Sequence, residues 1–77
     1  MRNLMKEEIK KNLLEDVKEF WQGRGNYLAK FSLAEKEDCT GLYGETPEDI
    51  RDNFFEYLKD KNIPYKNIGC LIFLKIA

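Results

Sequence analysis

The sequence predicts a small α+β domain, with its elements in the order helix, strand, strand, helix, strand and a mostly antiparallel three-stranded sheet packed by two helices. Three observations lead to this prediction. Apolar residues recur at helical spacing over about 5–21 and 47–61, apolar and polar residues alternate over about 27–34, and an apolar run occupies about 68–76. The 77 residues, 43% of them hydrophobic, are enough for a single domain over 1–77 and too few for two.

The first predicted helix covers about residues 5–21. Its apolar side chains share about half of the helix circumference, and charged side chains fill the other half. These apolar residues are Met5, Ile9, Leu13, Leu14, Val17, Phe20 and Trp21. Gly23 and Gly25 follow, and they predict the end of the helix and a connection to the next element.

The predicted strands cover about residues 27–34, 39–43 and 68–76, and a polar turn at 35–38 separates the first two. The first strand alternates as a half-buried strand does. The last strand is apolar on both faces, for which there are two explanations. Either one helix packs on each side of the sheet, or both helices cover one face and a second subunit or partner covers the other.

The second helix, over about 47–61, has a strong start signal. Thr46 is the expected N-cap, Pro47 suits the first helical position, and Glu48 and Asp49 meet the positive end of the helix dipole. Asp49 also forms an imperfect capping box. A proline after the helix predicts its end, since the residue before a proline avoids helical geometry. The residues expected to face the core are Ile50, Phe54, Tyr57 and Leu58.

Histidine is absent, which removes the commonest general base and the commonest metal ligand. Cys39 and Cys70 are too few for a closed zinc site, and we expect free thiols, with one disulfide as the alternative. Cys39 follows Glu37 and Asp38, which disfavour its thiolate, and Cys70 is expected in the core. Carboxylate pairs occur without a nucleophile or cofactor loop. The sequence therefore predicts no enzyme, no metal site and no cofactor.

The formal net charge is -1, which predicts no bulk attraction to nucleic acid. Residues 31–60 nevertheless carry nine acidic and three basic groups. Acidic residues recur every four positions on the second helix, opposite its core face: Glu48, Asp52, Glu56 and Asp60. Each such pair destabilises a helix by about 0.2–0.5 kcal/mol, so folding alone does not explain the row. It is either a solvated face or a surface that meets a basic partner.

Phe55 lies beside this row on a helical projection, away from the core stripe. It either packs under the preceding loop or forms the centre of an interface. We expect a small non-enzymatic inhibitor that covers a basic surface of a partner protein. The residues expected to bind that partner are Glu48, Asp52, Phe55 and Glu56, supported by Glu37, Asp38 and Glu45.

From Tyr27 onward the chain resembles HicB-type antitoxins. The residues that carry the resemblance are 27–31, Asp38-Cys39, the helix start 44–50, Asn53 and Ile63-Pro64. The chain departs from that family by beginning with a helix rather than a strand, and Asp38 stands where a glycine is usual. The resemblance implies a protein that neutralises a small basic RNA-cleaving toxin by covering its active face.

Two alternatives stay open: a phage-type anti-defence protein that mimics nucleic acid in a nuclease complex, and a structural homodimer. We expect a two-fold homodimer, because a monomer would leave apolar surface of the first helix and last strand exposed to water. The longest apolar stretch, 68–74, is far short of the roughly 20 residues that a membrane-spanning helix needs. We therefore expect a cytoplasmic protein that binds neither membranes nor nucleic acid directly.

Overall fold

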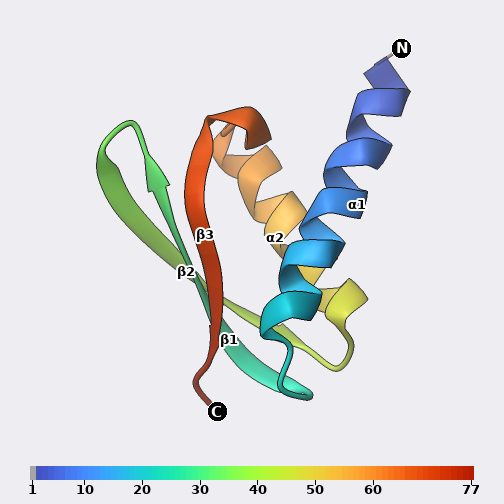
Figure 1. Ribbon diagram of the computed structural model, residues 1–77, viewed down its shortest axis with the longest axis vertical. Coiled ribbons are helices and arrows are strands. Elements are labelled where there is room, and N and C mark those ends of the chain that lie inside the picture. The colour runs from blue at the N-terminus through green and yellow to red at the C-terminus, as the bar shows by residue number, and fades with distance from the viewer. Residues whose placement is uncertain (1) are drawn as a thin grey trace.

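The computed structural model describes residues 2–77, with side chains from residue 6 onward, and it confirms the predicted fold class and element order (Figure 1). The predicted core position Met5 lies outside the described side chains. The elements are α1 (Arg2–Phe20), β1 (Gly25–Leu33), β2 (Lys36–Gly44), α2 (Pro47–Lys61), a 3-10 turn (Tyr65–Asn67) and β3 (Ile68–Lys75).

The three strands form one antiparallel sheet in the order β2-β1-β3. Strand β2 begins three residues earlier than predicted, because the β1–β2 turn is shorter than the predicted 35–38. Ala34 and Glu35 have positive φ angles of 50° and 72°, the conformation of a two-residue hairpin turn. Pairing therefore continues without a shift to Leu33 and Lys36.

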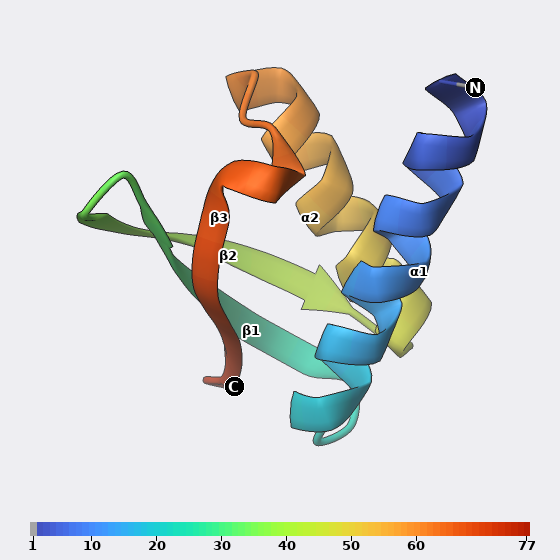
Figure 2. The same ribbon diagram turned by 45° about the horizontal axis from the view of Figure 1, so that its top comes forward.

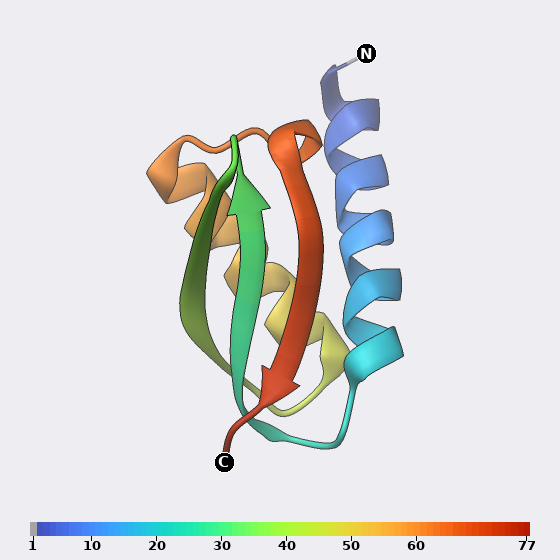
Figure 3. The same cartoon turned by 60° about the vertical axis from the view of Figure 1, so that its left-hand side comes forward.

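Both helices lie on the same face of the sheet, as Figure 3 shows, and the strands form the other side of the molecule in Figure 2. Helix α2 packs on β2, whereas α1 contacts α2 and β3. Of the two explanations for the last strand, the structure therefore supports the second: one face of the sheet is covered by helices and the other is open.

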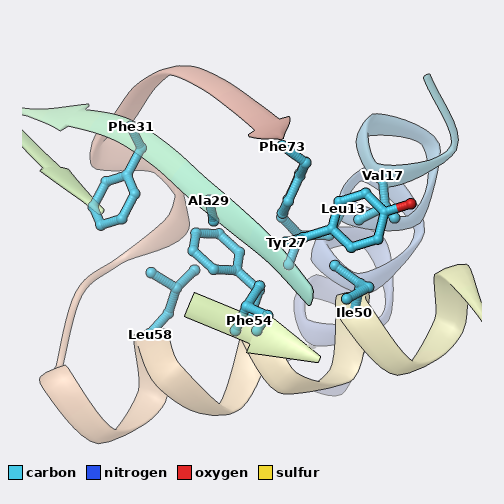
Figure 4. Close-up of a cluster of buried hydrophobic side chains, with 10 residues drawn as sticks. Leu13, Val17, Tyr27, Ala29, Phe31, Ile50, Phe54, Leu58 and Phe73 are labelled. Carbon is cyan, nitrogen blue, oxygen red and sulfur yellow. The ribbon is translucent and has the colours of Figure 1, made fainter. Parts of the chain in front are cut away.

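The core lies between the helices and the sheet, and Figure 4 shows it in close-up. Phe54 of α2 occupies its middle, with edge-on contacts to Phe31 and Phe73 at ring-centroid distances of 5.7 Å each. The predicted core residues of α2 other than Tyr57, which is half-buried, are fully buried. The buried side chains are Leu13, Val17, Tyr27, Ala29, Phe31, Leu42, Ile50, Phe54, Leu58 and Phe73.

Tyr27 holds the connection between α1 and β1. Its ring stacks on Trp21 at a centroid distance of 5.3 Å. Its hydroxyl accepts a hydrogen bond from the Gln22 backbone N–H (2.7 Å) and donates one to the Gly23 carbonyl (2.6 Å). The buried phenol thus satisfies its own polar atom and two backbone groups of the loop. Helix α1 ends at Phe20, one residue before the predicted end.

The N-terminus of α2 begins at the predicted cap, with one difference. The Thr46 hydroxyl accepts a hydrogen bond from the Asp49 N–H at 3.2 Å. The Asp49 carboxylate, however, accepts from the backbone N–H of Glu45 at 3.0 Å, one residue before the cap. The helix ends at the predicted Lys61, with Asn62 in the left-handed conformation as its C-cap.

Cys70 does not lie in the core, so the prediction for this residue was wrong. Lys30 pairs with Ile72 and Ser32 pairs with Gly69, so two β3 residues face the single β1 residue between them. This β-bulge removes Cys70 from the apolar alternation of the strand. Cys70 has a φ of 48° and an exposed side chain.

Candidate functional site

The acidic row of α2 points into solvent. Because the apolar stripe of the helix turns toward the sheet, the side chains one half-turn away are directed outward. Four carboxylates are exposed along this face: Glu48, Asp52, Glu56 and Asp60. Within residues 6–77 there is one ion pair, between Arg51 Nε and Asp52 Oδ1 at 2.8 Å. An exposed pair of this kind contributes little to stability.

Basic side chains near α2 lie over aromatic rings instead of pairing with the row. Lys61 Nζ is 5.9 Å from the Tyr57 ring centroid, and Lys6 and Lys10 are 5.9 and 5.1 Å from that of Phe55. The chain therefore supplies the acidic row with a single basic partner in its described part, Arg51. The remaining charge is available to another molecule.

Phe55 lies on α2 between the buried core stripe and the acidic row, as the helical projection indicates. It is half-buried, packs against the core, and faces α1, whose lysines cover its ring. It lines a shallow groove between α1, α2 and the segment before β3, with Ile9, Pro64 and Tyr65. The structure thus places Phe55 against α1, not under the preceding loop.

The structure brings Asp38 to the second half of α2. Burial raises the pKa of the Tyr57 phenol, and the nearby carboxylate of Asp38 raises it further. Glu37 is the exposed neighbour of Asp38 at the beginning of β2. Glu45 is exposed at the opposite end of the strand, in the connection to α2. The predicted supporting carboxylates therefore lie at the two ends of β2, with α2 alongside.

The outer edge of β2 is the feature that sequence reasoning missed. Asn26 of β1 directs both of its backbone groups toward the C-terminal end of the chain, with N to Ala77 O at 3.1 Å and O to Ile76 N at 2.8 Å. Backbone direction alternates along an antiparallel strand, so Tyr43, which faces Asn26, points its backbone groups away from β1. The Asn53 side chain donates to that Tyr43 carbonyl at 2.7 Å.

The same alternation directs the backbone groups of Glu37, Cys39 and Gly41 outward. All three residues are exposed, and the space where a Gly41 Cβ would lie is empty to 4 Å. Sequence periodicity predicted this strand as a short return segment, and no local signal says which strand lies at a sheet edge. The one sequence feature that relates to this edge is Asn53, whose side-chain amide reaches the Tyr43 carbonyl.

A second exposed surface lies on the open face of the sheet. Three large apolar side chains there are strongly exposed: Tyr43 at 50%, Leu74 at 43% and Ile76 at 60%. Leu28 and Ile72 share this face, because they alternate with buried neighbours on their strands. We call these five residues the open-face patch.

The described residues hold neither a cluster of metal-ligating side chains nor a helix that could span a membrane. No group of three or more cysteine, aspartate or glutamate side chains is gathered there as a metal site. Cys39 and Cys70 are free and exposed. None of the helices in residues 2–77 is long and apolar enough to cross a membrane.

Together, the fold and the site define a small α+β domain with an exposed acidic helix beside an unpaired strand edge. Family models, curated protein sequences and solved structures give no significant match to this chain. The relationship of residues 27–76 to HicB-type antitoxins stays a prediction.

Proposed function

We propose that this protein is a non-enzymatic inhibitor that binds a basic partner protein and covers part of its surface, as antitoxins do. The observation that supports this proposal is the exposed acidic row of α2, which has one basic partner, Arg51, among the described side chains. The row holds three like-charged pairs at helical spacing, each unfavourable by about 0.2–0.5 kcal/mol. A basic partner relieves this repulsion and is attracted to the row during encounter.

The test compares two variants with the same loss of charge. Asp52→Asn with Glu56→Gln removes the two central charges of the acidic row, and Glu15→Gln with Glu19→Gln removes two exposed carboxylates at the same spacing on α1. The unmodified protein is used to capture partners from its host, and the captured protein is identified, purified and assayed for its own activity with added inhibitor.

We expect the unmodified protein and the α1 variant to bind and inhibit the same basic protein. The α2 variant should bind it about tenfold more weakly, with the difference decreasing as salt rises. Equal binding by both variants would show that the acidic row is only a solvated surface.

A partner that processes nucleic acid fits the same surface, because its phosphate-binding channel is basic. This is the anti-defence form of the proposal, in which the acidic row replaces nucleic-acid phosphates. Competition separates the two forms. RNA or DNA that displaces the inhibitor from the partner indicates a shared nucleic-acid channel, whereas a complex that tolerates bound nucleic acid indicates a different basic surface.

Self-association through the open-face patch is a second candidate role, supported by the exposure of Tyr43, Leu74 and Ile76. Exposed apolar surface of this kind is typical of interfaces. Sedimentation of the unmodified protein and of Leu74→Lys tests it. A dimer that Leu74→Lys converts to a monomer supports this role. A monomer at about hundred-micromolar concentration contradicts it. The free energy of dimerisation would then be on the order of 5 kcal/mol or less in magnitude, too little for a stable dimer.

A further inference from the structure

We propose that the outer edge of β2 binds an extended, basic segment of the partner as a fourth strand of the sheet. This inference rests on the proposed function, because it names the form in which the basic partner is recognised. Two independent features carry it: the direction of the β2 backbone and the charges on both sides of the edge.

Over residues 37–41 the backbone of β2 points away from β1. Glu37, Cys39 and Gly41 direct their N–H and C=O groups outward, and their register with β1 has no bulge or shift. The Cys39 N–H donates to the Asp38 carboxylate at 2.8 Å, a contact within the strand that an added strand would replace. A strand edge that no other strand pairs with is a template for an added strand. At the far end, Asn53 already satisfies the Tyr43 carbonyl, so an added strand ends before that residue.

The other edge of the sheet is protected. Helix α1 runs beside β3, as Figure 3 shows, and contacts it. The bulge at Cys70 also interrupts the regular backbone of that strand. Bulges and covering helices are the usual devices that prevent pairing at an edge. The β2 edge has no bulge over residues 37–41, which makes it the edge available to a partner.

Acidic side chains lie near this edge on both faces of the sheet. Asn53 shows which side of α2 faces the edge, and Glu56 and Asp60, three and seven positions later, share that side. Asp38 lies on the helix face opposite Phe31, near Tyr57, and Glu37 lies on the open face. Basic side chains would find a carboxylate on either face of an added strand.

The basic groups near the edge reduce this charge without reversing it. Lys36 lies at the hairpin end of β2, and Lys61 lies over the Tyr57 ring. Lys30 lies across from Cys39 on the open face, close to Glu37. The four carboxylates named above outnumber these three cations by one. A second copy of the chain fits poorly here, because pairing β2 with β2 about a two-fold axis would bring two acidic flanks together.

A synthetic peptide in which lysine and valine alternate is the probe for this edge. Its binding to the unmodified protein is followed by amide chemical shifts and by hydrogen exchange of individual amides. We expect shifts centred on residues 37–41 and slower exchange of the Glu37 and Gly41 amides. The same peptide N-methylated at every backbone nitrogen keeps its charge but loses its N–H donors, and should bind about tenfold more weakly.

The chain also offers a matched pair of variants. Gly41→Pro removes one outward N–H at an edge position where proline is tolerated, and Gly41→Ala keeps the N–H and adds a methyl group in empty space. The variants should have the amide spectrum of a folded protein. We expect Gly41→Ala to bind the peptide like the unmodified protein and Gly41→Pro to bind about tenfold more weakly.

Three results would overturn the inference: no binding of the peptide at millimolar concentration, equal binding of the N-methylated peptide, or shifts centred on the open-face patch or α1. These results leave the proposed function intact if the captured partner still depends on Asp52 and Glu56. Conversely, a captured partner whose binding does not depend on those charges contradicts the proposed function. In that case, addition of the peptide as a strand would still support an edge that binds basic segments.

Discussion

The side chain of Asn53 donates a hydrogen bond to the backbone carbonyl of Tyr43, with 2.7 Å between Nδ2 and O. This contact joins the middle of α2 to the outer edge of β2. The two residues are ten positions apart in the chain. It satisfies a carbonyl that β1 cannot reach, and it marks the end of the backbone that stays open to a partner.

Removing this contact should destabilise the fold. Asn53→Ala is expected to lower the free energy of unfolding by about 1 kcal/mol, the net value of a typical hydrogen bond. Glu56→Ala, on the exposed side of the same helix, is the control and should change it little. Urea titration measures both. An Asn53→Ala variant as stable as the unmodified protein would show that water replaces the amide without loss.

Neutralising the two central carboxylates of the acidic row should not lower the free energy of unfolding. Asp52→Asn with Glu56→Gln removes like-charge repulsion at helical spacing, so unfolding should cost the same or up to about 1 kcal/mol more. Glu48→Gln should lower stability by a few tenths of a kcal/mol, roughly, because Glu48 interacts with the positive end of the helix dipole. Thermal unfolding at low ionic strength separates the two signs. A clear loss of stability in the double variant would contradict this account of the row.

Phe54 and Phe55 are adjacent in sequence and should behave differently. Phe54 is fully buried, and Phe54→Ala should cost about 3–5 kcal/mol, enough to unfold a domain of this size. Phe55 is half-buried against α1, so Phe55→Ala should cost roughly half as much and loosen α1 first. Hydrogen exchange along α1 measures the second effect. Unchanged exchange in Phe55→Ala would mean that α1 does not depend on this ring.

Cys70 is strained in the left-handed region, with a φ of 48°. Cys70→Gly should therefore raise the free energy of unfolding by about 1 kcal/mol, because glycine adopts this conformation without steric cost. Cys39→Gly is the matched control on a regular strand, and it should lower stability instead. Chemical denaturation decides between them. If both changes destabilise equally, the bulge does not store strain at Cys70.

The free energy of unfolding should depend on pH through Asp16. Burial raises the pKa of its carboxyl, and the charges of Glu19 and Glu15 raise it further. The folded state therefore disfavours the ionised form, and the stability contributed by protonated Asp16 is lost as pH rises through its folded pKa. Asp16→Asn should be more stable than the unmodified protein at pH 7, and the difference should vanish below about pH 3.8. A variant that is less stable at pH 7 would contradict this sign.

Local patterns in the sequence were sufficient for the elements and their order. The apolar stripe through Leu13 and Val17, the alternation from Tyr27 to Phe31, and the Thr46 cap each act within a few residues. Periodicity and capping are local interactions, so a single sequence reports them directly. The same reasoning placed the acidic carboxylates of α2 on a solvent face, because side-chain direction follows from helical geometry.

Only the tertiary structure decided which surfaces are available to a partner. Both helices pack on one face, which leaves Leu74 exposed on the other, and the long pairing of β1 with β2 leaves Gly41 at an open edge. A bulge moved Cys70 outward, and α1 covered Phe55 with two lysines. Each of these outcomes depends on contacts between segments far apart in the chain. Such contacts have no local periodicity, so strand order, register and helix placement emerge only when the whole core is assembled.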